Sequence, residues 1–279
     1  MSVSLGVMIA HKSPDLLDRG YVQALASLLE DEACESVWIG DHPALGYDAD
    51  GRWFPSPPSP LEWLTLVAAY STSLKLGTAV LVLPFQHPIV LAKRIATVDR
   101  LSNGRVIVGV GLGSRPREAD ALDVDMSTRA GLATESIEVM RAIWTADGRA
   151  SFDGRFFSFH DVDPAPRPAQ PLGPPITIGG NSLAAARRAG RLGHGLIPLG
   201  CEPERIQRLI DVARTEAVHG GWDTALIELT VQFDTDAMTL RRLLDTGASR
   251  VILDAPPSGD LAELRDAVHA AKDILASVQ

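Results

Sequence analysis

Asp41 and His42 are the neighbouring side chains most suggestive of chemistry in this sequence. They directly follow a short apolar run at Ser36–Ile39, which has the composition of a buried strand. A histidine next to a carboxylate can accept or donate a proton near neutral pH, so the pair could take part in acid–base catalysis. The alternative is structural, with His42 serving only to begin the next loop. The residue types alone leave both interpretations open.

Two glycine-rich segments, 109–114 and 179–182, also follow apolar runs. The first departs from the dinucleotide-binding fingerprint, and Arg115–Pro116 is not expected to open a helix. This segment could let a planar ligand lie against the backbone, or it could simply form a tight turn. The second precedes a helical pattern, and the free N–H groups at a helix start bind phosphate. Its alternative is a capped helix with a solvated face of arginines.

The amino-acid composition and the net charge argue against several classes of function. The chain has 279 residues, 46% of them hydrophobic, which is an ordinary globular composition. A net charge of −9 without a basic block argues against nucleic-acid or membrane-surface partners. The longest apolar run, Thr78–Phe85, is too short to span a bilayer. The sequence begins without a signal-peptide pattern, so we expect a cytoplasmic protein.

Metal and nucleophile motifs are missing from the sequence. It contains no His-Glu-x-x-His, no Cys-x-x-Cys, no Gly-Lys-Ser/Thr phosphate loop and no Gly-x-Ser-x-Gly elbow. Its two cysteines, Cys34 and Cys201, have no metal-ligand spacing. We therefore expect no metal site and no covalent catalysis by cysteine or serine.

A repeating pattern in the sequence predicts the strands and helices that would position these residues. Apolar, β-branched runs alternate with amphipathic segments, which is typical of βα units. The predicted strands are Val3–Ile9, Ser36–Ile39, Lys75–Leu83, Arg105–Val110, Ile176–Ile178, Gly195–Leu199, Ile227–Phe233 and Arg250–Leu253. The predicted helices are Asp18–Ala33, Pro60–Thr72, Pro88–Leu101, Leu132–Trp144, Ser182–Arg191, Pro203–His219, Ala237–Asp245 and Leu261–Val278.

Eight such units in this length predict an α/β fold, a (β/α)8 TIM barrel, with a doubly wound open sheet as the second choice. Two longer stretches, 41–59 and 148–175, are interpreted as insertions after strands 2 and 4. The second holds an expected hairpin at Ala150–Phe159. We expect one domain over residues 1–279. In a barrel, active-site groups lie at the carboxyl ends of the strands, where Asp41, His42 and both glycine-rich segments fall.

The stretch His87–Arg105, continuing into Gly109–Gly113, resembles the signature of the bacterial luciferase-like oxidoreductases. Four further blocks, which follow one another in the family's order, resemble the same family: Ser36–His42, Arg129 and Glu135 with Ala142–Trp144, Asp153–Phe157 and Pro174–Gly180. The resemblance runs from about residue 36 to residue 200 and is weaker in the C-terminal third.

This resemblance implies a barrel that binds coenzyme F420, or alternatively FMN, at its C-terminal mouth. It also implies a non-proline cis peptide at or near Ala79–Val80, and a homodimer. Asp41 and His42 would lie beside the cofactor ring and act as the catalytic residues. The cofactor-binding residues would be Asp41, Thr78, Ala79, Val80, Gly111, Gly113, Ser114, Gly179, Gly180, Asn181, Leu199 and Gly200.

The expected function is hydride transfer between F420 and a small organic substrate. One alternative is an FMN-dependent monooxygenase supplied by a partner flavin reductase. Another is a barrel that binds a flavin or other ligand without catalysis, since a fold does not guarantee activity. Some sugar-phosphate-oxidising relatives carry an acidic catalytic residue where Ser114 stands here, so that particular chemistry is in doubt.

Overall fold

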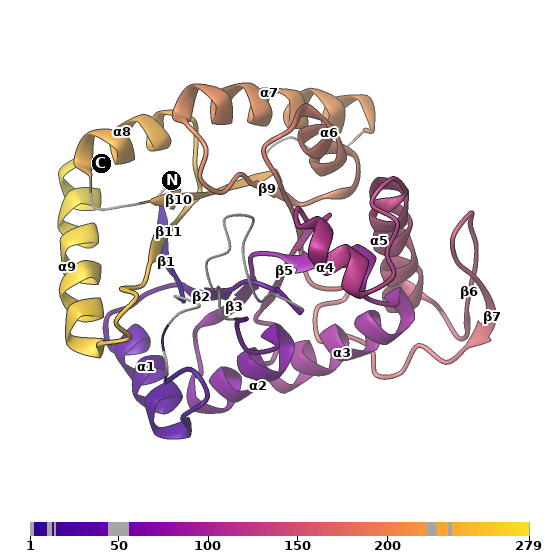
Figure 1. The fold of residues 1–279 in the computed structure, drawn as a ribbon, viewed down its shortest axis with the longest axis horizontal. Helices are drawn as coiled ribbons and strands as arrows, with labels where there is room; N and C mark the ends of the chain where they lie inside the picture. The colour runs from indigo at the N-terminus through magenta and orange to yellow at the C-terminus, as the bar shows by residue number, and fades with distance from the viewer. Residues whose placement is uncertain are drawn as a thin grey trace.

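The chain folds into a closed parallel barrel with helices on its outside (Figure 1). The computed structural model describes residues 3–9, 13, 15–43, 56–221, 227–233 and 236–278. The strands follow the order β3-β2-β1-β11-β10-β9-β8-β5-β4, and β3 also pairs with β5 and closes the ring. The predicted (β/α)8 barrel is therefore confirmed, and the open doubly wound sheet is wrong.

The barrel strands lie close to their predicted positions. The expected third strand, Lys75–Leu83, is divided into two short strands, and a 3-10 turn at Leu83–Phe85 follows them. The peptide bond between Ala79 and Val80, where the two strands are separated, is cis. The barrel strands are β1 (Ser4–Met8), β2 (Ser36–Ile39), β3 (Lys75–Thr78), β4 (Leu81–Val82), β5 (Val106–Gly111), β8 (Ile176–Gly179), β9 (Gly195–Ile197), β10 (Glu228–Phe233) and β11 (Arg250–Asp254).

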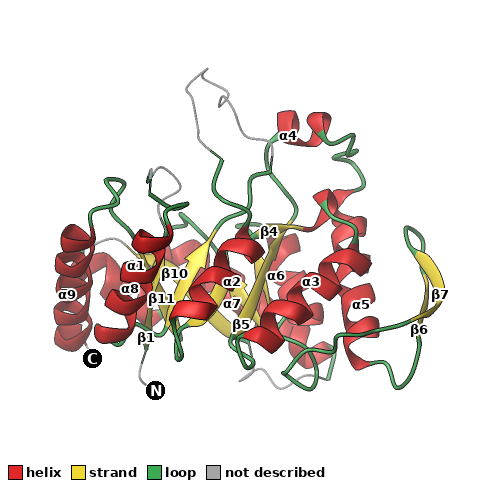
Figure 2. Ribbon diagram, turned by 90° about the horizontal axis from the view of Figure 1, so that it is seen from below, coloured by secondary structure: helices red, strands yellow, loops and turns green. Residues whose placement is uncertain are grey.

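The helices between these strands also match the pattern, and several begin with proline at the first turn, where its missing N–H costs nothing. The helices are α1 (Arg19–Asp31), α2 (Pro60–Tyr70), α3 (Pro88–Leu101), α4 (Pro116–Ala121), α5 (Arg129–Thr145), α6 (Leu183–Leu192), α7 (Pro203–His219), α8 (Ala237–Asp245) and α9 (Leu261–Val278). Figure 2 shows the short helix α4 beyond the strand ends, on the side away from the marked termini.

The core has two layers. A large cluster lies between the strands and the outer helices, and a small inner cluster fills the barrel itself. Trp38 is the largest inner side chain and is fully buried. A Cβ atom at Gly77 would lie 2.2 Å from the Trp38 ring, so the absence of a side chain there makes room for the indole.

An ion-pair network closes the amino-terminal end of the barrel. Arg250 is 3% exposed and donates to both carboxylate oxygens of Glu35. It also bonds Glu228 at 3.1 Å, and its guanidinium lies 5.6 Å from the Trp38 ring. Lys75 bonds the same Glu35 at 2.7 Å. Burial raises the pKa of Glu35, but the hydrogen bonds and charges of Arg250 and Lys75 outweigh burial and hold this pKa at about 2.

The stretch between α5 and β8 is fixed to the barrel by two carboxylates. It contains the expected hairpin, with strands β6 (Ala150–Asp153) and β7 (Ser158–Val162). Glu135 of α5 accepts backbone N–H bonds of 2.6 to 2.9 Å from residues 155–157 in the hairpin turn. Asp99 of α3 is fully buried and holds the proline-rich part by accepting from Ala169 and Gln170 at 2.8 and 3.0 Å.

Candidate active site

A cavity of about 440 Å³ opens at the carboxyl ends of the strands. This volume falls in the ordinary range for small-molecule sites. The structure brings most of the predicted site residues together there: Asp41, His42, Ala79, Val80, Gly111, Gly113, Ser114, Gly179, Gly180, Asn181 and Leu199 all line it.

The floor of the cavity is formed by Val80, directly after the cis peptide that the resemblance implied. Two glycines flank it. A Cβ atom at Gly111 would lie 2.5 Å from Cγ2 of Val80, and a Cβ atom at Gly179 would lie 2.7 Å from Cγ1. Both positions therefore need glycine, and the floor beside Val80 stays free of projecting side chains. Such a floor suits the face of a flat ring.

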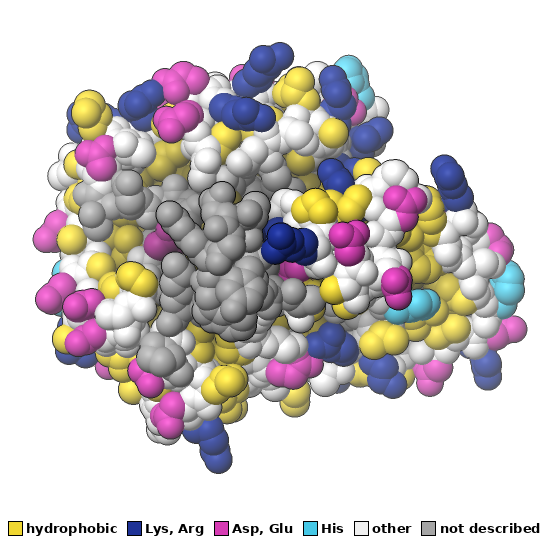
Figure 3. All heavy atoms as spheres, in the orientation of Figure 1, with side chains coloured by type: hydrophobic (Ala, Val, Ile, Leu, Met, Phe, Trp, Pro, Cys, Tyr) yellow, Lys and Arg dark blue, Asp and Glu magenta, His cyan; other side chains and the backbone are white. Residues whose placement is uncertain are grey.

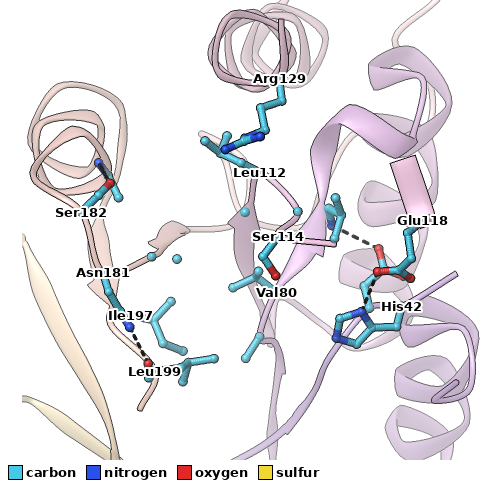
Figure 4. Close-up of a pocket in the computed structure, with 18 residues that line it drawn as sticks. His42, Val80, Leu112, Ser114, Glu118, Arg129, Asn181, Ser182, Ile197 and Leu199 are labelled. Carbon is cyan, nitrogen blue, oxygen red and sulfur yellow. Dashed lines mark hydrogen bonds and ion pairs between the residues drawn. The ribbon is translucent and has the colours of Figure 1, made fainter. Parts of the chain in front are cut away.

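One wall holds a histidine–carboxylate pair. Nδ1 of His42 lies 3.0 Å from Oε2 of Glu118, which comes from helix α4 (Figure 4). The Glu118 side chain is 3% exposed and the His42 side chain 24% exposed. In the neutral imidazole, a proton on Nδ1 bonded to the carboxylate leaves Nε2 as the proton acceptor. The pair can thus orient the ring and stabilise its positive charge when it takes up a proton.

Asp41 has a different role from its neighbour. It is 7% exposed, and its Oδ2 accepts hydrogen bonds from the Val82 amide at 3.2 Å and from the Gln86 side chain at 3.0 Å. Gln86 in turn accepts from Arg94 at 3.1 Å. Burial raises the pKa of Asp41, against the opposing effect of these two hydrogen bonds. Asp41 therefore fastens the end of β2 to the segment that carries the cavity floor.

The opposite wall is the turn from β8 into α6. Gly180 has φ of +129°, a conformation that favours glycine. Ser182 caps the helix by accepting from the Ala185 amide at 3.1 Å, and the Asn181 side chain donates to the Leu199 carbonyl at 2.8 Å. Figure 4 shows Arg129 extending from the start of α5 toward the cavity. Backbone N–H groups, a helix start and a guanidinium together favour an anion at this wall.

The arginines of α6 lie elsewhere. Arg188 is 8% exposed and bonds Thr134 at 3.2 Å, so it fastens α6 to α5. Arg187 pairs with Glu216 of α7 at 3.5 Å. Among the described residues, the arginine that lines the cavity is Arg129, which sequence spacing did not single out for the anion site.

Two predicted cofactor residues lie outside the cavity lining. Thr78 is fully buried beneath the floor, where its hydroxyl donates to the Gly109 carbonyl at 2.8 Å. Gly200 lines a neighbouring cavity of about 240 Å³, and its amide donates to Gln232 at 3.1 Å. The expected loop 41–59 is described only at its ends, because residues 44–55 lie outside the described ranges.

Glu118 is the main site residue that the sequence did not indicate. The prediction that Arg115–Pro116 does not open a helix is wrong, because α4 begins at Pro116. Proline at the first position with an acidic residue in the first turn is itself a helix-start signal, and it could have revealed α4.

Neither a metal-binding cluster nor a membrane-spanning helix is found among the described residues. Within the described ranges, no group of three or more His, Cys, Asp or Glu side chains could hold a metal ion. No helix in the described part of the chain has the length and apolar character needed to cross a membrane.

Curated relatives match about three quarters of this chain. An F420-dependent glucose-6-phosphate dehydrogenase from Kineococcus radiotolerans is 30% identical over 229 residues, or 78% of this chain and 65% of that protein. The chain spans less than two thirds of the length of the first curated relatives it matches.

Solved structures share the fold at low identity. An F420-dependent secondary alcohol dehydrogenase in complex with an F420–acetone adduct superposes with a TM-score of 0.81 at 18% identity, covering 100% of both chains. The oxygenating constituent of 3,6-diketocamphane monooxygenase from Pseudomonas putida, in complex with FMN, gives a TM-score of 0.79 at 15% identity, covering 100% of this chain and 99% of that one.

The sequence profile of the luciferase-like monooxygenases matches residues 4–236. With most of its length matched by that profile, the chain belongs to the luciferase-like monooxygenase family.

Proposed function

We propose that this chain is an oxidoreductase that transfers a hydride between coenzyme F420 and a small organic substrate. The observation that carries the proposal is a single cavity that combines a glycine-flanked floor at Val80, the His42–Glu118 pair and the Gly179–Ser182 helix start. A deazaflavin would need these three features for its ring, for proton transfer and for its phosphate. When bound, the coenzyme would supply the hydride chemistry.

The chain's own residues would do the rest. Val80, with Gly111 and Gly179 beside it, would support one face of the ring. His42 would accept a proton from a substrate hydroxyl at Nε2, or return it in the reverse direction, while Glu118 stabilises the charged imidazole. The amides of 179–182 and Arg129 would face the phosphate. Asp41 would hold the cavity floor next to the end of β2 by accepting the hydrogen bond of the Val82 amide.

The named activity of the Kineococcus relative supports F420 as the cofactor. The second candidate is an FMN-dependent monooxygenase that receives reduced flavin from a partner reductase, and the FMN-containing structural neighbour favours it. A cytoplasmic location, a single domain over residues 1–279 and a homodimer belong to the same proposal. The first rests on the sequence lacking a signal-peptide pattern, the second on the repeated strand–helix pattern and the third on the family resemblance.

A fluorescence titration of the purified protein with F420 and with FMN tests the cofactor. Tight binding of F420 with no binding of FMN supports the proposal, and the opposite result makes the FMN enzyme the better description. Binding of neither favours a barrel that holds another ligand without this chemistry.

A variant pair tests the reaction. His42→Ala should reduce turnover by about a hundredfold or more, the usual range for a lost acid–base group, with little change in the Kd for F420. His160→Ala is the matched control, since that side chain is 64% exposed on the hairpin. Unchanged turnover of His42→Ala in a screen of alcohol and aldehyde donors would remove the proposed role of this residue.

A further inference from the structure

A series of four hydrogen-bonded side chains leads from the surface to Asp41, and we call it the Asp41 network. Oε1 of Glu62, on α2, accepts from Arg94 of α3 at 2.5 Å. Arg94 also donates to Oε1 of Gln86 at 3.1 Å, and Nε2 of Gln86 donates to Oδ2 of Asp41 at 3.0 Å. Figure 3 shows basic and acidic side chains together over α2 and α3, where the network meets solvent. An ion pair at the surface is therefore connected to the buried carboxyl group beside the cavity.

Arg94 fixes the direction of the hydrogen bonds in this network. A guanidinium has only donors, whereas a glutamine amide has both donors and an acceptor. Because Gln86 presents its oxygen to Arg94, its NH2 group is directed at Asp41. A protonated Asp41 could donate to Gln86 only if the amide turned its NH2 group toward the guanidinium, where it would meet another donor. The network therefore favours a charged Asp41.

The surroundings of Asp41 make this support necessary. Its side chain lies in a residue that is 7% exposed, and burial raises its pKa. The carboxylate of Glu118, on α4, raises this pKa further. The Val82 amide, the Gln86 side chain and the charge of the neighbouring His42 oppose both effects and lower it. Loss of the hydrogen bond from Gln86 would therefore shift the balance toward a neutral carboxyl group.

We propose that Arg94 is a positioning residue of the active site, because it orients Gln86 and so keeps the Asp41 carboxylate charged. A charged carboxylate accepts the hydrogen bond of the Val82 amide more strongly than a neutral one would. Val82 lies two residues after Val80, so this bond holds the floor on which the cofactor ring would lie. The inference deepens the proposed function, and its effect on turnover rests on that function.

Carboxyl-carbon NMR of protein labelled at its aspartates measures the titration of Asp41 without any cofactor. The Asp41 signal is identified by its absence in Asp41→Asn. Arg94→Met should move the titration to higher pH, because the charged form loses an amide that was held toward it. Arg94→Lys keeps a cation that has only donors and should restore the wild-type titration. Arg100→Met makes the same change at an exposed position of α3 and should leave the titration unchanged.

A double substitution separates the orienting role of Arg94 from a direct effect of its charge. In a Gln86→Leu background, Arg94→Met should cause no further shift, because the side chain that connects Arg94 to Asp41 is gone. An equal shift with and without Gln86 would overturn the inference, and so would an unchanged titration in Arg94→Met. Arg94→Gln also lacks the fixed set of donors and should shift the titration in the same direction, so it replaces the methionine variant if melting curves show that variant to be unfolded.

The pH dependence of turnover connects the network to the reaction. In Arg94→Met, the acid limb of the kcat profile should move to higher pH by the same amount as the Asp41 titration. Turnover should recover above that limb, since Asp41 is charged there again. A shifted titration with an unmoved kcat profile would overturn the role of Arg94 in the reaction. If the wild-type protein does not bind F420, the proposed function fails, and the NMR titration still decides whether Arg94 controls the charge of Asp41.

Discussion

Replacing Glu35 with Gln should lower the free energy of unfolding by about 3 kcal/mol at pH 7. The carboxylate bonds buried Arg250 through two oxygens and also pairs with Lys75. Burial raises the pKa of Glu35, but Arg250 and Lys75 hold it at about 2, against 4.5 for an ordinary glutamate. At about 1.4 kcal/mol per pKa unit, that difference corresponds to roughly 3 kcal/mol. The loss agrees with the cost of leaving a buried guanidinium partly unpaired.

The effect has a defined pH dependence. Because the pKa of Glu35 is lowered on folding, its stabilisation is fully present above about pH 5 and is lost as the pH falls toward 2. The gap between the wild-type protein and the variant should therefore be constant from pH 7 to about pH 5 and narrow below it.

Denaturant unfolding followed by tryptophan fluorescence at several pH values measures this gap. Glu204→Gln is the control, because its pair with Arg242 is exposed to solvent and should contribute little to stability. Equal stability of Glu35→Gln and the wild-type protein at pH 7 would refute the reasoning. So would a gap at pH 3 as large as the gap at pH 7.

Three further predictions concern the site and its supports. Glu118→Gln removes the charge beside Nδ1 of His42, so it should lower turnover about tenfold or more and leave the Kd for F420 nearly unchanged. Steady-state kinetics and parallel titrations measure the two quantities. A weakened Kd with normal turnover would contradict this role. Gly111→Ala places a Cβ 2.5 Å from Val80, so it should lower the free energy of unfolding by about 1–3 kcal/mol and weaken cofactor binding. Thermal unfolding and a binding titration measure these effects. Normal binding would mean that the cofactor does not lie on the cavity floor. Asp99→Ala should free the tract around Ala169 and speed its cleavage in limited proteolysis, and unchanged cleavage would show that other contacts hold it.

The regular parts of the fold were predictable because each βα unit carries its own periodic pattern. Helices such as α3 and α7 begin and end at their predicted residues, since proline marks their starts. Helix α4 has only six residues and no apolar periodicity, so its one sequence signal is the proline and the acidic residue in its first turn. Glu118 reaches His42 across 76 positions of sequence, a contact that only the closed barrel creates.

The family signature is informative about the fold for a physical reason. Within His87–Arg105, Asp99 is fully buried and holds the proline-rich tract, while Arg105 donates to the carbonyls of Ser102, Leu74, Ala68 and Ser71 at 2.7 to 3.1 Å. These residues fix loops to the barrel and lie outside the cavity lining. This part of the resembling stretch therefore fixes loops to the barrel, whereas its continuation, Gly109–Gly113, supplies Gly111 and Gly113 to the cavity.

Under the proposed function, Ser114 and Glu118 limit the reactions that this cavity can support. Both residues line the cavity, and Glu118 supplies a carboxylate four residues after Ser114 in the sequence. From there it bonds Nδ1 of His42, so under the proposed function it positions the histidine and leaves Nε2 as the one proton-handling atom of the pair. A reaction that moves one hydride and one proton, such as oxidation of a simple alcohol, needs no more than this. A substrate that requires a second acid in the place of Ser114 should react poorly, and Ser114→Glu should be needed to accept it.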